Sequence, residues 1–218
     1  MTKTLFLFAV LPAICAGQAP STTLTAATAA DKLSGAGGFL QRWLLLEPIP
    51  VTGLTDSAVQ ATVKKSVYVP LLEGLPASGQ KVRIDDVELA WHAMDMRNYN
   101  VNLYHFARTL GKKTSDILVW AVTVVHAPRD LENVRLAIGS NSASIWWVNG
   151  REVIGIYGDR QTVIDDGVSR RLTLRKGANV IRAAIVNGGG ATDFCARFLD
   201  ANDQPVTGLV IRLKDDRR

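Results

Sequence analysis

Residues 144–154 read Ser-Ile-Trp-Trp-Val-Asn-Gly-Arg-Glu-Val-Ile, and this stretch decides the fold class. Apolar runs rich in β-branched and aromatic residues lie on both sides of Asn149-Gly150, which is typical of two strands. Asn-Gly accepts the positive φ angles of a type I′ turn, because glycine has no side chain to clash and asparagine tolerates the left-handed region. The stretch therefore predicts a β-hairpin that turns at Asn149-Gly150.

Short apolar segments separated by turn residues lie on both sides of this hairpin. Residues 116–125 form a nearly continuous run of β-branched and aromatic residues, which is typical of a central strand. The same reasoning predicts strands at 39–49, 87–92, 100–107 and 134–138, a hairpin at 171–186 turning at 176–179, and a last pair at 194–199 and 206–213. Residues 55–65 alone predict a short helix, with Asp56 as its N-cap. Many short strands and at most one short N-terminal helix indicate an all-β sandwich.

The N-terminus has the order of a secretory signal peptide. Lys3 precedes an apolar run that contains Pro12, and small residues follow. The run is shorter than the ~20 residues that a membrane-spanning helix requires. We therefore expect a secreted or periplasmic protein that divides into a signal peptide at 1–19, a flexible linker at 20–38, a β-sandwich domain at 39–213 and a charged tail at 214–218.

The charge balance is mildly basic. The 218 residues carry 25 Lys and Arg against 20 Asp and Glu, which gives a net charge of +5. This charge is spread along the chain, and nucleic-acid-binding proteins usually concentrate theirs in one patch. Together with the expected export, the composition predicts no nucleic-acid partner and no membrane partner after signal removal.

Few residues carry a recognisable chemical motif. No nucleophile elbow and no zinc-ligand spacing occurs, and Ser140 and Ser142 are the best nucleophile candidates, with turn serines as the alternative. Cys195 is expected to be a buried, inert thiol, because its neighbours are apolar. No cofactor is expected apart from calcium, which prefers oxygen ligands of the kind that predicted loops offer at Asp159, Asp165, Asp166, Asp193, Asp200, Asn202 and Asp203. Solvated turn residues are the alternative interpretation of these positions.

The doubled tryptophan is the candidate binding feature. Adjacent residues on a strand point to opposite faces, so Trp146 and Trp147 are not expected to share one core. One indole is predicted to pack between the sheets and the other to offer a platform for a sugar ring, unless a loop covers it. Tyr157, Arg160 and Asn187 complete this predicted carbohydrate site with polar groups.

Several of these segments resemble the galactose-binding-like jelly-roll domains of bacterial polysaccharide-degrading proteins. The resemblance rests on four stretches of the sequence: 142–153, 171–179, 186–190 and 194–199. Residues 41–49 are similar to the entry strand of the same group, and the whole chain is similar to regions labelled acetylxylan esterase. The resemblance implies a jelly-roll β-sandwich over about residues 39–213.

The resemblance also implies a role in the breakdown of plant polysaccharides. The function expected from it is that of a secreted, non-catalytic carbohydrate-binding module for xylan or another cell-wall polysaccharide or oligosaccharide, with a possible catalytic partner protein. A different function, an esterase that removes acetyl groups from xylan, is the first alternative. A structural accessory domain is the second.

Overall fold

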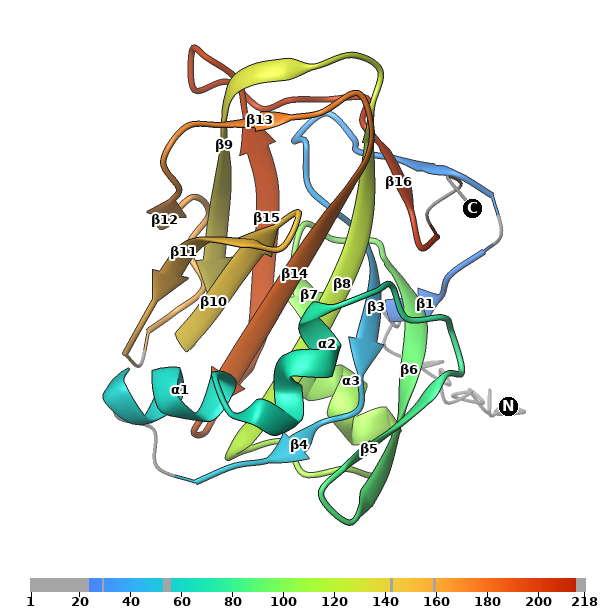
Figure 1. Ribbon diagram of the computed structural model, residues 1–218, viewed down its shortest axis with the longest axis vertical. Coiled ribbons are helices and arrows are strands. Elements are labelled where there is room, and N and C mark those ends of the chain that lie inside the picture. The colour runs from blue at the N-terminus through green and yellow to red at the C-terminus, as the bar shows by residue number, and fades with distance from the viewer. Residues whose placement is uncertain (1–23, 29, 53–55, 142, 159, 215–218) are drawn as a thin grey trace, which may run out of the picture.

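The protein is a β-sandwich, which confirms the fold class predicted from the sequence. The computed structural model describes residues 24–28, 30–52, 56–141, 143–158 and 160–214. In this part of the chain one sheet has 11 strands and the other has 5 (Figure 1). The predicted signal peptide lies outside the described residues.

Long antiparallel strands form the centre of the larger sheet. Its main path runs in the order β1 (Leu24–Ala26), β6 (Val87–Met96), β3 (Arg42–Leu46), β8 (Ile117–Ala127), β14 (Gly177–Asn187), β10 (Ala143–Val148) and β11 (Arg151–Ile156). Shorter strands pair at its margins: β2 (Lys32–Leu33), β4 (Ile49–Pro50), β5 (Lys81–Ile84) and β16 (Val210–Arg212).

The smaller sheet closes one face of the larger one. It contains β12 (Gly167–Val168), β9 (Leu131–Ser140), β15 (Asp193–Leu199) and β7 (Val101–Asn102), with β13 (Leu172–Leu174) paired to β9. The chain passes repeatedly from one sheet to the other, from β8 to β9, from β9 to β10 and from β14 to β15. This alternation is the jelly-roll connectivity, and it places the inter-sheet core between the two sheets.

Helical segments cover part of the other face of the larger sheet. They are α1 (Asp56–Val63), the 3-10 turn η1 (Ser66–Tyr68) and α2 (Val69–Leu72), so the expectation of at most one short helix is wrong. Val59, Val63, Tyr68 and Leu71 pack there against strand residues that include Trp120, and form a second, helix-covered core. Among the described residues no helix is long and apolar enough to span a membrane.

The predicted hairpin at residues 144–154 is confirmed. Strands β10 and β11 pair antiparallel, and Asn149 and Gly150 have φ angles of 51° and 81°. Positive φ at both central residues is the requirement of a type I′ turn. Strands β3, β6, β8 and β9 likewise lie where the sequence predicts strands.

Three other predictions need correction. The segment 171–186 is not a hairpin, because β13 pairs with β9 in the smaller sheet while β14 pairs with β8 and β10. Most of the strand predicted at 100–107 is helix α3 (Leu103–Thr109), whose first turn is capped by the Asn102 side chain accepting the backbone N–H of His105 at 2.7 Å. The last predicted pair meets only at one bridge, Leu199 with Pro205, since β16 pairs with β2 and β8.

The segment predicted as a linker takes part in the sandwich. Strand β1 pairs with β6, and β2 pairs with β16. The hydroxyl of Ser34 is buried and accepts the backbone N–H of Leu209 at 3.0 Å. The ordered domain therefore extends N-terminally of Phe39, because small residues at 24–38 form edge pairings that composition does not reveal.

Candidate functional site

Both tryptophans of the hairpin are buried. Trp146 is 0% exposed in the inter-sheet core, where it meets the edges of the Trp43 and Phe194 rings. Trp147 is 6% exposed in the helix-covered core and stacks on Trp120 at a centroid distance of 5.6 Å. The two indoles do point to opposite faces, but both faces are covered. The predicted exposed sugar platform is wrong, because α1, η1 and α2 cover the outer face of the sheet.

The polar residues predicted beside the tryptophans do not gather round an open cleft. Tyr157 is half-buried and packs against the helix-covered core. Arg160 forms an ion pair with Asp166 at 3.3 Å. Asn187 is completely buried, and its Nδ2 donates to the backbone oxygen of Thr114 at 3.3 Å. A glycan could not reach the amide of Asn187 in this arrangement, and the roles of Tyr157 and Arg160 stay predictions.

The predicted nucleophile and thiol are enclosed by the fold. Ser140 ends β9 and is 0% exposed, while Ser142 lies outside the described residues. Burial is the largest cause that raises the pKa of Cys195, to about 12, and Asp165 adds to it. A thiol with so high a pKa is almost entirely protonated at neutral pH, so Cys195 is an inert core residue as expected.

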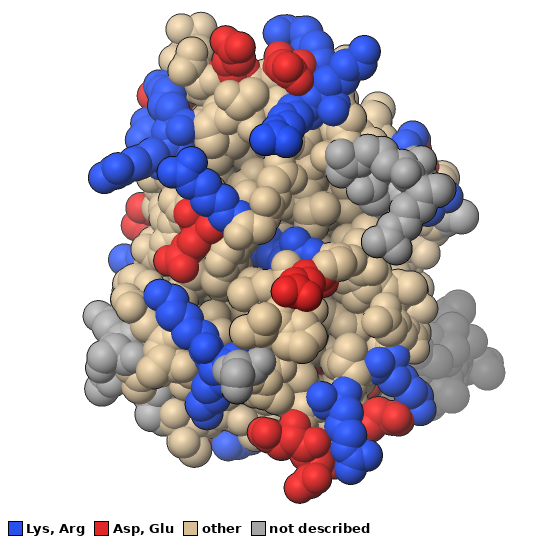
Figure 2. Space-filling view, viewed as in Figure 1, with Lys and Arg blue, Asp and Glu red and all other residues tan. Residues whose placement is uncertain are grey.

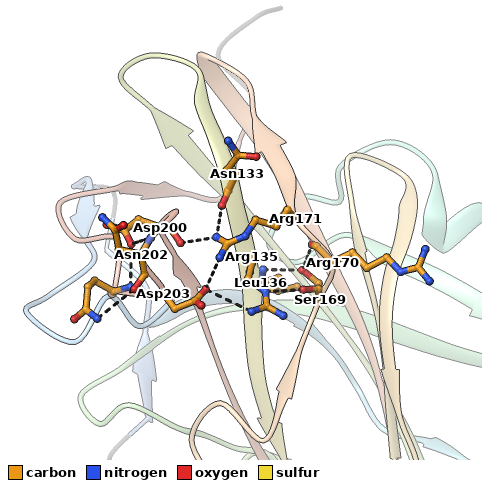
Figure 3. A network of polar contacts seen from close by, with 10 residues as sticks. Asn133, Arg135, Leu136, Ser169, Arg170, Arg171, Asp200, Asn202 and Asp203 are labelled. Atoms are coloured by element: carbon orange, nitrogen blue, oxygen red, sulfur yellow. Dashed lines mark hydrogen bonds and ion pairs between the residues drawn. The ribbon is translucent and has the colours of Figure 1, made fainter.

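Two of the loop carboxylates considered for calcium, Asp200 and Asp203, have partners within the chain. Asp200 Oδ1 accepts the backbone N–H groups of Asn202 and Gln204, at 2.8 and 2.9 Å. Asp203 pairs with Arg171 at 3.1 Å and with Arg135 at 3.5 Å (Figure 3). In the part of the chain that the structure describes, no group of three His, Cys, Asp or Glu side chains could hold a metal ion.

An open groove lies beside the Asn149-Gly150 turn, between β11 and β13. Its volume is about 640 Å³. The ten residues that line it are Val148, Asn149, Arg151, Glu152, Val153, Arg170, Arg171, Leu172, Thr173 and Arg175. We call it the arginine groove, because four of these residues are arginines. Figure 2 shows several basic side chains on the upper left of this face, over the region where Figure 1 places β11 and β13.

The four arginines have different roles. Arg171 donates to the backbone oxygens of Asn133 and Asp200, at 2.7 and 2.9 Å, in addition to its ion pair with Asp203. Among the described residues, Arg151, Arg170 and Arg175 have no carboxylate partner within 4.0 Å, and all three are exposed. One acidic side chain, Glu152, also lines the groove. Three guanidinium groups are therefore available to a ligand.

The backbone beneath Arg170 is held firmly. Ser169 exchanges two hydrogen bonds with Leu136 of β9: its backbone N–H donates to the Leu136 oxygen, and its side-chain hydroxyl accepts the Leu136 N–H at 2.9 Å. Arg135 Nε donates to the Ser169 oxygen at 3.0 Å. Figure 3 shows Arg171 pointing into this network and Arg170 pointing away from it. A fixed backbone lowers the entropy that Arg170 loses when it binds a ligand.

The turn at the edge of the groove is also anchored. The Asn149 N–H donates to the Val180 oxygen at 2.8 Å, and the Asn149 side chain accepts the Val180 N–H at 2.9 Å. Asn149 Nδ2 donates to Asn179 Oδ1 at 2.9 Å, and Asn179 is completely buried. The hairpin end that carries Arg151 is therefore fixed to β14.

No protein-family model and no curated protein matches this chain. Among solved structures, a β-glucosidase from Kluyveromyces marxianus in complex with glucose is similar to this chain at 20% sequence identity and a TM-score of 0.39. The match covers 57% of this chain and 16% of the β-glucosidase chain. A PA14 sugar-binding domain from an RTX adhesin matches 78% of this chain and 96% of its own, at 10% identity and a TM-score of 0.44. These distant likenesses show nothing about what the present chain binds.

Proposed function

We propose that the protein is a secreted, non-catalytic carbohydrate-binding module that recognises an acidic glycan through the arginine groove. The observation that carries this proposal is the presence of three exposed arginines without ion pairs, Arg151, Arg170 and Arg175, on one groove. Guanidinium groups bind carboxylates through paired, charge-assisted hydrogen bonds. Xylan that carries glucuronic acid groups offers carboxylates of this kind and fits the expected link to plant polysaccharides.

The shape of the groove also supports a sugar ligand. A site for a sugar combines apolar contact with a few fixed polar groups. Val148, Val153 and Leu172 provide apolar surface beside the arginines, and Asn149 provides a fixed polar edge. The groove is open, as a site for part of a polymer must be. A catalytic role is less well supported, because Ser140 is 0% exposed.

The test compares binding of glucuronoxylan with binding of the same polymer after chemical reduction of its carboxylates. Isothermal titration calorimetry of the full chain should show binding of the acidic polymer only. The variant Arg170→Gln/Arg175→Gln should bind at least about tenfold more weakly, because each lost charged hydrogen bond is worth roughly 1.5–3 kcal/mol. Lys81→Gln/Arg83→Gln removes the same charge from the exposed strand β5 and is the matched control.

Three results would contradict the proposal. Equal binding of the reduced polymer would show that carboxylates are not recognised. Equal binding of DNA or heparin would reduce the groove to a general polyanion surface, for which affinity falls steeply with salt. Robust release of acetate from acetylated xylan would contradict a non-catalytic role.

Export is tested by N-terminal sequencing of the mature protein, which should begin between Gly17 and Pro20.

A further inference from the structure

A second pocket lies on the other side of the Asn149-Gly150 turn. Its volume is about 490 Å³, and its walls come from the segment between α2 and β5, the hairpin turn, β14 and the end of the described chain. Asn149 lines both this pocket and the arginine groove. We call it the Arg182 pocket, after the arginine of β14 that lines it.

Arg182 is almost completely buried. It is 5% exposed, and it alternates along β14 with Ile181 and Ala183, which face the inter-sheet core. Its side chain is therefore on the face covered by helices, where it is opposite Trp147 in the β10 register. Figure 2 shows basic side-chain atoms recessed in the middle of this face, where Figure 1 places β14.

The guanidinium of Arg182 lacks a charge partner among the described residues. One terminal nitrogen donates to the backbone oxygen of Gly74, and Nε is buried with no hydrogen-bond partner. Arg182 forms no ion pair with any described carboxylate, including that of Glu73 beside Gly74. Burial lowers the pKa of Arg182, and among the described residues no carboxylate offsets this effect. A guanidinium remains charged at neutral pH even so.

This arrangement is unfavourable for the protein alone. A buried charge is strongly destabilising unless it is paired and its N–H groups are satisfied, and a guanidinium has five of them. Arg42, the other arginine among the buried residues, is paired with Asp95 through two hydrogen bonds of 2.7 and 2.8 Å. Arg182 lines an open pocket and has no such partner in the part of the chain that the structure describes, so a ligand could supply the missing carboxylate.

We propose that the Arg182 pocket is a carboxylate subsite that holds the uronic acid unit of the glycan bound by the arginine groove. This rests on the proposed function for the identity of the polymer, but the pairing with a carboxylate follows from the pocket itself. The terminal N–H groups of Arg182 that Gly74 does not occupy bind the carboxylate oxygens. Leu75, Pro76 and Val180 contact the C–H face of the sugar ring. Asn149, shared by both sites, lies where one glycan chain would cross the turn.

The test uses three small probes, sodium glucuronate, sodium acetate and glucose, each titrated calorimetrically into the full chain. Glucuronate should bind, and glucose should not. Arg182→Lys, which keeps the charge but lacks the planar fork, should bind glucuronate at least about tenfold more weakly at an unchanged melting temperature. Arg182→Met should lose binding and melt at the same or a higher temperature, because it removes a buried unpaired charge.

The outcomes separate this inference from the proposed function. The control Arg170→Gln/Arg175→Gln should bind glucuronate as the unaltered protein does, even though it binds the polymer poorly. If the unaltered chain binds the acidic polymer but no glucuronate, the subsite is overturned and the proposed function stands. If glucuronate binds and the polymer does not, the proposed function fails and the pairing with a carboxylate stands. Equal affinity for acetate would overturn the assignment to a sugar.

A carboxylate from the chain itself is the remaining competitor. Lys214 lines the pocket, and Asp215 and Asp216 follow it in the sequence. The variant Asp215→Asn/Asp216→Asn tests this directly. It should bind glucuronate no more tightly than the unaltered chain. Binding at least tenfold tighter in this variant would show that the chain's own aspartates occupy Arg182, and would overturn the subsite. A strong fall in the melting temperature of Arg182→Met would also overturn it, as the mark of a purely structural arginine.

Discussion

At the scale of single residues, two glycines of the sandwich resist substitution for different reasons. Gly150 has a φ of 81°, but no atom lies within 4 Å of where a Cβ would be. A side chain there costs only backbone strain, and a β-branched one costs most. A Cβ on Gly139 would lie 2.1 Å from the backbone oxygen of Val163. That contact cannot be relieved unless the segment over β9 moves.

The two positions should therefore respond differently to alanine. Gly150→Ala is expected to lower the free energy of unfolding by about 1 kcal/mol, and Gly150→Val by about 1–3 kcal/mol. Gly139→Ala should cost more than Gly150→Ala, because overpacking adds to the loss and displaces a covering segment. Urea denaturation of the three variants measures this. Gly150→Asn, which tolerates positive φ, is the control and should be near neutral. A smaller loss in Gly139→Ala than in Gly150→Ala would contradict the close contact.

The carboxylate of Glu47 makes the stability of the fold depend on pH in the acidic range. Its carboxylate accepts hydrogen bonds from Lys112 at 3.0 Å and His92 at 3.2 Å. Burial raises the pKa of Glu47, but Lys112 and His92 together lower it further, so the net pKa lies below its ordinary value of 4.5. The unfolded chain thus binds this proton more tightly than the folded protein does. The carboxylate stabilises the fold fully above about pH 4.5 and loses this contribution as the pH falls through the folded pKa.

The variant Glu47→Gln isolates this contribution. The unaltered protein should melt at a higher temperature than the variant from pH 5 to pH 7, by a constant margin, because the carboxylate is ionised in both the folded and unfolded states. The margin should shrink as the pH is lowered below about 4.5. Thermal denaturation at a series of pH values measures it. A margin that stayed the same down to pH 3 would show that Glu47 does not carry the effect.

The residues of the proposed binding sites could be predicted only in part at this scale. The sequence places Arg170, Arg171, Arg175 and Lys176 within seven positions, and this local cluster was the available signal for the arginine groove. The net charge hides it, because the basic residues elsewhere make the charge look evenly spread. Arg151 joins the groove from the hairpin turn, and Arg182 faces a pocket built from segments distant in sequence. Neither placement follows from the local pattern.

At the scale of the elements, the helical cover explains why the tryptophan prediction failed. Alternation along β10 correctly sends Trp146 and Trp147 to opposite faces. It cannot indicate that α1, η1 and α2 pack over the outer face. The Asn-Gly turn, by contrast, was predictable because its chemistry is local. The hairpin predicted at 171–186 was wrong, because a turn sequence shows that the chain reverses and does not show which strand becomes the partner.

Trp147 should therefore behave as a core residue. Trp147→Ala is expected to lower the free energy of unfolding by about 3–5 kcal/mol, as Trp146→Ala should, because each leaves a cavity. The two variants should differ in which part of the structure loses local stability. Hydrogen exchange in Trp147→Ala should rise in α1 and α2, which pack on that face, and in Trp146→Ala across the smaller sheet. A Trp147→Ala protein of unchanged stability would indicate that the indole is not buried.

At the scale of the whole molecule, the N-terminal segment completes the sandwich. Leu24 is 7% exposed, and β1 covers the edge of β6. Arg42 is 4% exposed, and it donates to the oxygen of Ala30 and to the Thr28 hydroxyl at 3.3 Å. A chain that begins at Phe39 would expose this arginine and leave the edges of β6 and β16 unpaired. Composition alone suggested a linker because Ala, Thr, Ser and Gly are common in both linkers and short edge strands.

A truncated chain beginning at Phe39 should therefore melt below one beginning at Pro20. The loss should be at least about 2 kcal/mol, the order expected when one large apolar side chain such as Leu24 no longer finds a buried site. Asp31→Asn in the longer chain is the control. It breaks the 2.6 Å ion pair with Arg212, and exposed pairs contribute little to stability, so it should not reproduce the loss. Equal melting temperatures for the chains that begin at Phe39 and at Pro20 would show that residues 20–38 act only as a linker. A lower melting temperature for the chain that begins at Phe39 would make the segment part of the domain, so that any shortened form of the protein must retain it.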